Sequence, residues 1–130
     1  MPQISVDRAL ELMGDDVAAL LAFSPVSLGV ANPPNVPGVY MLLVDDEIVY
    51  VGEAKGAKGL RDRLLSKHIS GDDNHAIQRA FKPDFPDRGL RRDHIKGTVS
   101  ARWLSIADTA RVSTVERFLI WLYKPAWNKK

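Results

Sequence analysis

The spacing of apolar residues divides the chain into short helices and strands. From Ser5 to Phe23, apolar side chains recur at helical spacing, and the Ser5 hydroxyl can cap the free amides at the helix start. Gly14 followed by Asp15 can divide this segment into two shorter helices. The next stretch, Ser24 to Pro37, contains four prolines, which neither a helix nor a central strand sustains. We therefore expect a linker or wrapping loop there.

A β-hairpin is predicted next. Two apolar runs, Val39–Val44 and Ile48–Val51, flank the polar turn Asp45-Asp46-Glu47. Both faces of the first strand are apolar, so we expect the hairpin to be covered on both sides.

The rest of the chain predicts two helices, a strand and a last helix. The expected segments are a helix from Leu60 to Ile69, a helix from His75 to Phe81, an irregular basic loop from Lys82 to Gly97, a strand from Thr98 to Ile106, and a helix from Asp108 to Tyr123. This order predicts an α+β fold, with a small three-stranded antiparallel sheet flanked by helices and an added N-terminal helical segment. We place the N-terminal helical extension and proline-rich linker at residues 1–36 and the main domain at residues 37–130.

Composition limits the class of protein. A chain of 130 residues with 45% apolar residues fits one globular domain. The absence of cysteine excludes disulfides, thiolate nucleophiles and cysteine-ligated zinc. Neither an apolar run long enough to span a membrane nor a secretory signal is visible. We therefore expect a cytoplasmic protein that does not bind membranes.

The net charge of +2 hides an asymmetry between the two ends of the chain. Residues 1–50 hold one basic residue and seven acidic ones, a net charge of −6, whereas residues 51–130 hold 17 basic and nine acidic residues, a net charge of +8. Such a division favours an anionic partner, nucleic acid above all, although solvated surface charge alone can also produce it.

Two tripeptides mark the predicted hairpin and should bring their tyrosines together. Gly38-Val39-Tyr40 opens the first strand and Tyr50-Val51-Gly52 closes the second. Arg63, Glu116 and Asn128 follow on the later segments. This ordered set resembles the signature of the GIY-YIG nuclease superfamily, from Pro37 to Asn128. The resemblance implies a GIY-YIG-like nuclease domain over residues 37–130.

Glu116 is the candidate metal ligand. It falls inside the apolar arc of the last helix, where a carboxylate is costly unless it is paired or bound to a cation. A structural pair with Arg63 or Arg111 is the alternative. A single carboxylate allows a magnesium-type ion that is also held by waters and a substrate phosphate. The resemblance implies this role for Glu116, with Mg²⁺ or Mn²⁺ as cofactor.

Arg63 and the two residues at the end of its helix are candidate phosphate ligands. A guanidinium suits a phosphate oxygen that gains charge during hydrolysis, and the resemblance assigns this role to Arg63, whose alternative is a solvated surface position. Lys67 lies one turn further on and can hold phosphate or lower a tyrosine pKa. His68 is a candidate nucleic-acid ligand, but its place in the apolar arc favours a partly buried structural histidine.

The resemblance assigns Tyr40, Tyr50 and Asn128 to the catalytic set. Tyr40 is expected to deprotonate the attacking water and Tyr50 to position the water or phosphate, although strand tyrosines usually pack in the core and a phenol needs a nearby cation to act as a base. Asn128 is expected to fix the geometry of the site through hydrogen bonds.

The further candidates for contact with nucleic acid are Gly52, Lys55, His75, Arg91 and Arg92. His75 resembles a histidine that precedes an Ile-Gln-containing helix in homing-type relatives. Repair-type relatives usually carry lysine after Tyr-x-Gly, where this chain has Glu53, and Lys55 can take over that function. For His75, helix capping or solvent exposure is the favoured alternative.

Together these features predict a metal-dependent endonuclease that hydrolyses phosphodiester bonds of DNA, with RNA left open as a substrate. The alternatives are a catalytically weak nucleic-acid-binding module, and a nuclease toxin or phage endonuclease controlled by a protein partner. Specificity could also come from a partner subunit or a homodimer.

Overall fold

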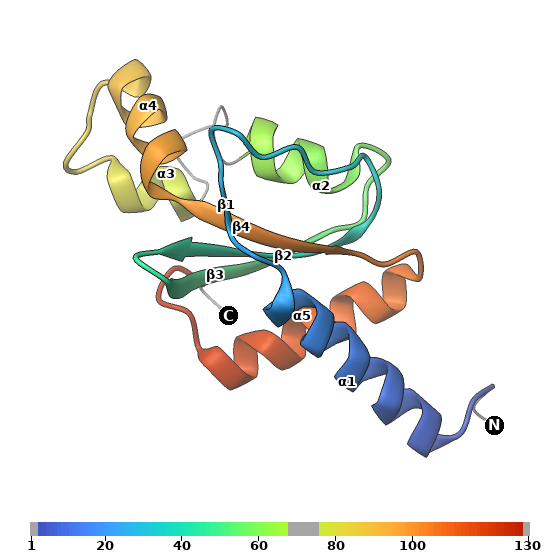
Figure 1. Ribbon diagram of the computed structural model, residues 1–130. Coiled ribbons are helices and arrows are strands. Elements are labelled where there is room, and N and C mark those ends of the chain that lie inside the picture. Colours follow the sequence, from blue (N-terminus) through green and yellow to red (C-terminus); the bar gives the residue numbers. More distant parts are fainter. Residues whose placement is uncertain (1–2, 68–75, 129–130) are drawn as a thin grey trace.

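The computed structural model describes residues 3–67 and 76–128, apart from the side chains of residues 66, 67 and 76. Figure 1 shows a sheet with helices on both faces. The elements in chain order are α1 (Val6–Ala22), β1 (Val26–Ser27), β2 (Gly38–Val44), β3 (Glu47–Ala54), α2 (Gly59–Arg61), the π-helix η1 (Asp62–Lys67), α3 (Ala76–Phe81), α4 (Arg88–Thr98), β4 (Ser100–Ser105) and α5 (Thr109–Tyr123).

The sheet is antiparallel and has four strands in the order β1-β4-β2-β3. Three of them are the predicted hairpin and the predicted third strand. The fourth, β1, is a two-residue strand in the proline-rich segment, where Val26 pairs with Ala101 and Ser27 with Ser100. The sequence analysis missed β1 because two residues are too short for an alternating pattern.

The turn of the hairpin explains its sequence. Asp45 and Asp46 form a two-residue connection with positive φ angles of 50° and 64°. Such a turn matches the twist of the flanking strands, and aspartate tolerates the left-handed region better than most residues do. A bulge between Leu42 and Leu43 shifts the register, so that Tyr50 lies opposite Leu42 and Gly52 opposite Tyr40.

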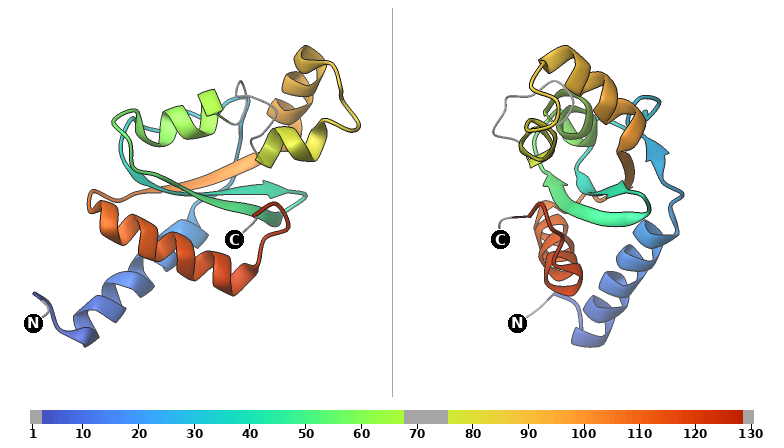
Figure 2. Two further views of the ribbon diagram at one scale, coloured as in Figure 1. Left: turned by 180° about the vertical axis from the view of Figure 1, so that it is seen from behind. Right: turned by 90° about the vertical axis from the view of Figure 1, so that its left-hand side faces the viewer.

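Helices cover both faces of the sheet (Figure 2), and an apolar layer lies between the sheet and the helices on each face. α1 and α5 cover one face, where Val39, Met41 and Val51 pack against helix residues such as Leu20 and Leu119. α2, η1, α3 and α4 cover the other face, where Tyr40 and Leu42 pack against Leu60, Leu64, Ile77 and Ile95. The expectation of a hairpin covered on both sides is confirmed.

The segment predicted to be an irregular loop, Lys82 to Gly97, is for the most part the helix α4. Asp87 caps its start by accepting a hydrogen bond from the Leu90 amide at 2.9 Å. Two glycines and two prolines suggested a loop, but the prolines precede the helix and burial of Ile95 offsets the low helix propensity of glycine.

The N-terminal segment packs on the main domain. α1 runs without a break through Gly14, contrary to the suggested division, and its Leu20 lies in the core beneath the sheet. Asp16 forms a 2.8 Å ion pair with Arg111 of α5. None of the helices among the described residues has the length and apolar character needed to cross a membrane.

Candidate active site

A cavity of about 540 Å³ opens at the end of β3, where the chain turns toward η1. Its wall combines side chains of both charges with a glycine-rich turn. The lining residues are Glu53, Lys55, Gly56, Ala57, Lys58, Gly59, Asp62 and Arg63. Gly59 is required in this wall because its φ is +60° and a Cβ there would overlap the backbone of Val36.

Tyr40, Tyr50 and Arg63 form a cluster beside this cavity. The register of the hairpin places both tyrosines on one face of the sheet, with ring centroids 6.1 Å apart. The hydroxyl of Tyr40 is hydrogen-bonded to Arg63 and to Tyr50, and its ring is fully buried. Sequence-distant residues therefore meet here as the motif predicts.

The Tyr40 hydroxyl is held in its protonated form. Burial, in the first place, and the neighbouring Tyr50 raise the pKa of Tyr40 far above its ordinary value, while Arg63 lowers it by a smaller amount. A proton acceptor needs the opposite shift. This environment suits a phenol that orients Arg63, and the expected use of Tyr40 as a base stays a prediction.

Gly52 makes room for Tyr40. A Cβ at Gly52 would overlap the Cζ and hydroxyl of Tyr40 and approach Cε2 of Tyr50 to 2.8 Å. The missing side chain thus lets the two tyrosines lie over the strand. Gly52 was expected to contact nucleic acid, whereas the structure explains a glycine at this position by the packing of the tyrosines against it.

Arg63 lies on the π-helix η1 and is half-buried. A π-helical turn is wider than an α-helical turn, so the apolar stripe of an ideal α-helix does not correctly predict the direction of the Arg63 side chain. Its Nε is buried and has no hydrogen-bond partner among the described residues. Because Arg63 also lines the cavity, part of its guanidinium is left for a ligand.

Glu53 places a second unsatisfied atom at the cavity. Its Oε2 is buried without a hydrogen-bond partner among the described residues, while its Oε1 lies 3.5 Å from Nζ of Lys55. Lys55 also donates a 2.9 Å hydrogen bond to Oγ of Ser113 on α5. From the sequence, Glu53 was noted only as a departure from the family pattern. Its negative charge, at a position where repair-type relatives carry lysine, was the signal that could have identified it as a site residue.

Glu116 lies on α5 one turn beyond Ser113 and is only 3% exposed. Ser113 accepts a hydrogen bond from Lys55 at the cavity, whereas Glu116 is not among the residues that line it. α5 begins at Asp108, which caps the amides of Ala110 and Arg111. This cap fixes the helix that carries the carboxylate.

Asn128 binds the free edge of β3. Its side chain accepts a hydrogen bond from the Val51 amide and donates one to the Val51 carbonyl, each at 2.9 Å. The Trp127 amide donates to the Val49 carbonyl, also at 2.9 Å. The C-terminal segment therefore lies along the strand that carries Tyr50 and Gly52.

Arg91 and Arg92 lie outside this cluster. Arg91, expected to bind nucleic acid, is only 1% exposed: its Nε donates to Oε1 of Gln78 at 2.7 Å and its guanidinium to the carbonyls of Phe85 and Pro86. These contacts hold α3 against the start of α4, so that the expectation is wrong for Arg91. Arg92 is half-buried on α4 and does not line the cavity.

Three further candidates cannot be placed in the site. The side chain of Lys67 and both His68 and His75 lie outside the described residues. Their expected contacts with nucleic acid stay predictions.

The described residues suit a cation that is bound by few protein carboxylates and mainly by oxygens of water and phosphate. No group of three or more His, Cys, Asp or Glu residues that could hold a metal gathers within residues 3–67 and 76–128. The buried carboxylate of Glu116 and the unsatisfied Oε2 of Glu53 still offer hard oxygen donors, which Mg²⁺ prefers. The residues therefore fit an ion completed by waters and phosphate.

Comparisons with known proteins relate this geometry to a known fold. No family model matches the chain, and no curated protein sequence matches it. Among solved structures, the chain is similar to the GIY-YIG N-terminal endonuclease domain of UvrC from Thermotoga maritima, in an asparagine-to-alanine mutant bound to its catalytic divalent cation. That likeness has a TM-score of 0.50 and 18% identity and covers 80% of this chain and 92% of that one. This chain has the GIY-YIG fold.

Other structures of the same domain match similarly. The magnesium-bound form has a TM-score of 0.49 and 22% identity and covers 78% of this chain and 91% of that one. A tyrosine-to-phenylalanine mutant bound to its catalytic divalent cation has a TM-score of 0.49 and 19% identity over 89% of this chain and 97% of that one. The predicted α+β class is confirmed, with four strands in place of three.

Proposed function

We propose that the protein is a metal-dependent endonuclease that hydrolyses phosphodiester bonds of DNA. The observation that carries this proposal is the cavity at the end of β3, which Arg63 lines together with the cations Lys55 and Lys58. A cation held in place by Tyr40 yet not fully hydrogen-bonded is suited to an anionic ligand such as a phosphodiester.

Glu116 is the residue that would hold the divalent cation, with Glu53 able to bind the ion or one of its waters. When bound, Mg²⁺ or Mn²⁺ would neutralise charge on the phosphate and lower the pKa of water. Support comes from the buried position of the Glu116 carboxylate on α5, one turn beyond Ser113, which contacts Lys55 of the cavity wall.

The side chains of this chain can be assigned to one hydrolytic step. The water oxygen forms a bond to phosphorus, the bond from phosphorus to the 3′ oxygen breaks, and that oxygen leaves with the electron pair and takes up a proton from solvent. Arg63 binds the phosphate oxygen that gains charge, and Tyr40 orients Arg63. We assign the proton of the attacking water to Glu53, whose side chain lines the cavity and whose Oε2 has no hydrogen-bond partner among the described residues.

Relaxation of supercoiled plasmid with Mg²⁺ tests the proposal. We expect nicked product from the wild-type protein, none after chelation with EDTA, and none from Glu116→Gln. Glu47→Gln, which removes the same charge at the exposed start of β3, is the matched control and should cleave normally. Mn²⁺ binding measured by calorimetry should weaken in Glu116→Gln and stay unchanged in Glu47→Gln.

Two results would contradict the proposal. Cleavage that persists in EDTA would exclude the cation. Salt-dependent DNA binding with no cleavage under any divalent cation would favour the alternative of a nucleic-acid-binding module.

A further inference from the structure

A second hollow lies between α5 and the C-terminal segment that follows it. It has a volume of about 510 Å³ and mixes apolar with cationic side chains. Its lining residues are Arg117, Ile120, Trp121, Lys124, Pro125 and Asn128. Arg117, Trp121 and Lys124 are spaced four and three residues apart, which places them on one face of the helix.

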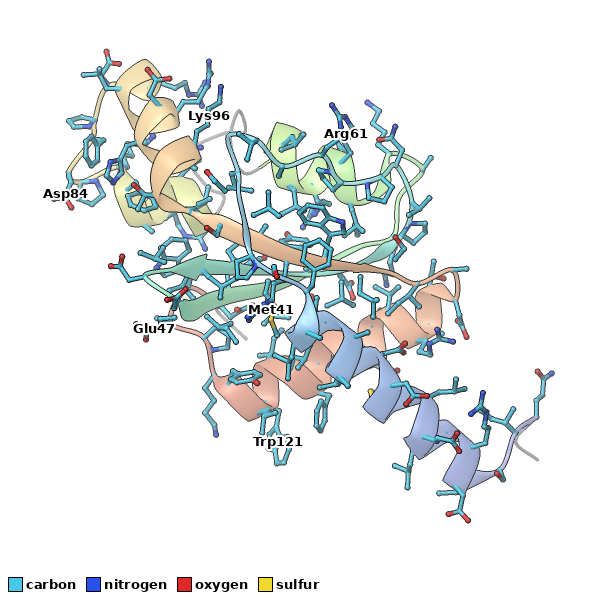
Figure 3. All side chains as sticks on the ribbon, in the orientation of Figure 1. Met41, Glu47, Arg61, Asp84, Lys96 and Trp121 are labelled. Carbon is cyan, nitrogen blue, oxygen red and sulfur yellow. The ribbon has the colours of Figure 1, made fainter. Side chains whose placement is uncertain are left out.

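Trp121 is the unusual member of this face. Its side chain is 67% exposed, although burial of an indole ring is strongly favourable. One neighbour is Phe118, with ring centroids 6.0 Å apart. Figure 3 shows Trp121 pointing away from the sheet into open space. An indole ring in this position can stack on a planar group that comes from outside the chain.

The two cations beside it are available for ligands. Arg117 and Lys124 are exposed, and neither has an ion-pair partner within residues 3–67 and 76–128. Lys124 closes α5 in the left-handed conformation, with a φ of 45°, which ends the helix beside the hollow. A ring flanked by two free cations complements a ligand with planar groups and negative charges, as a nucleic-acid strand has.

The hollow continues the edge of the sheet on which the candidate active site lies. Asn128 lines it and binds Val51 of β3 with the same side chain. Arg117 directly follows Glu116 on α5. Val51, which Asn128 binds, lies two residues before Glu53 of the cavity wall, a rise of about 7 Å along β3.

We infer that this hollow is a nucleotide subsite, in which Trp121 stacks on an unpaired base and Arg117 and Lys124 bind the flanking phosphates. The inference rests on the proposed function, because the strand that fills the hollow is the one cut at the neighbouring cavity. Stacking on an aromatic side chain tolerates any base. The subsite therefore selects substrates with unpaired nucleotides near the cut, such as forks and flaps, rather than a base sequence.

Fluorescence anisotropy with labelled DNA in EDTA tests the subsite without cleavage. The probes are a forked duplex with unpaired arms and a fully paired duplex of the same length. We expect Trp121→Ala to raise the Kd for the fork about 10-fold and to change the Kd for the duplex less than twofold. Trp121→Phe, which keeps a ring, should retain most of the affinity for the fork.

Matched variants separate stacking from other effects. Leu90→Ala removes another exposed apolar side chain, on α4, and should leave both Kd values unchanged. Arg117→Ala and Lys124→Ala should each reduce the slope of log Kd against log salt by about 0.7 for the single-stranded arms. Equal fork binding by the wild-type protein and Trp121→Ala would overturn the inference.

Three other outcomes are also decisive. If light scattering shows a wild-type dimer that Trp121→Ala converts to a monomer, the hollow is an interface between copies of the chain and the inference fails. If fork binding depends on Trp121 but no DNA is cleaved with Mg²⁺, the subsite stands and the nuclease proposal fails. If DNA is cleaved and Trp121→Ala changes neither binding nor cleavage, the nuclease proposal stands and the subsite inference fails.

Discussion

Two arginines in the helical layer above the sheet differ in how their side chains are satisfied. Arg91 on α4 is buried and gives its guanidinium to Gln78 and to two carbonyl groups. Arg63 on η1 is hydrogen-bonded to Tyr40, yet its Nε has no partner among the described residues and its side chain lines a cavity.

The difference separates a structural cation from one that is available to a ligand. A buried guanidinium that is fully hydrogen-bonded within the fold has little left to offer to a phosphate. One that lines a cavity and is not fully hydrogen-bonded within the fold is positioned for an anion without a large reorganisation. Both residues were candidate ligands from the sequence, and only their surroundings distinguish them.

The largest expected effect is on the activity of Arg63 variants. Arg63→Ala should lower the plasmid cleavage rate by roughly 10²–10³-fold, because it removes the donor to the phosphate oxygen that gains charge. Arg63→Lys should recover only part of the rate, since an ammonium cannot bind two oxygens in a fork. The midpoint of urea unfolding checks that both variants are folded, and wild-type cleavage by Arg63→Ala would refute the comparison.

Arg91 variants should show the opposite pattern. Arg91→Met leaves Gln78 and two carbonyl groups without their donor, so we expect a loss of about 3 kcal/mol in the free energy of unfolding. Cleavage per folded molecule should not change at a temperature well below the transition. Arg88→Met on the same helix is the control for loss of a positive charge at an exposed position. A stable Arg91→Met with weakened DNA binding would restore the nucleic-acid role.

A smaller effect on stability is expected for Asn128, which binds the edge strand β3 beside the site. Asn128→Ala removes two hydrogen bonds to Val51 and should cost about 2 kcal/mol of unfolding free energy. Cleavage should fall as well, because the same strand carries Tyr50 and Gly52. Hydrogen exchange of the Val51 amide provides the local measurement, and unchanged protection in Asn128→Ala would contradict the assignment.

The smallest effect concerns the partner of Arg63. Because the pKa of Tyr40 is raised in the folded state, folding keeps a proton that the unfolded chain releases near the ordinary tyrosine pKa of about 10. The stability due to this group is therefore full below pH 10 and declines above it, by about 1 kcal/mol at pH 11. Tyr40→Phe should lack this decline, whereas Tyr123→Phe should keep it, as urea unfolding at both pH values would show.

The sequence predicted those parts of the fold that depend on local patterns. The hairpin followed from two apolar runs around Asp45 and Asp46, and α5 followed from Asp108 and its apolar spacing. α4 was missed because its glycines and charges are typical of a loop, and its stability comes from burial of Arg91 and Ile95 against distant residues. Tertiary contacts of this kind leave no local signal.

The sequence predicted which residues form the site better than it predicted their chemical environment. The motif identified Tyr40, Tyr50 and Arg63 as neighbours, and the hairpin register with η1 brings them together. Complete burial of Tyr40, the unsatisfied oxygen of Glu53 and the π-helical turn of η1 depend on packing that spacing alone does not encode.

The side chain of Asn128 also has a consequence for association between molecules. An edge strand with free amides and carbonyls can pair with a strand of another molecule, which promotes aggregation. A primary amide offers N–H donors and a carbonyl acceptor, as a neighbouring strand does, and so it occupies both the N–H and the C=O of Val51. Aspartate at this position would have no N–H for the Val51 carbonyl, so a single deamidation event would open the edge of β3 to strand addition.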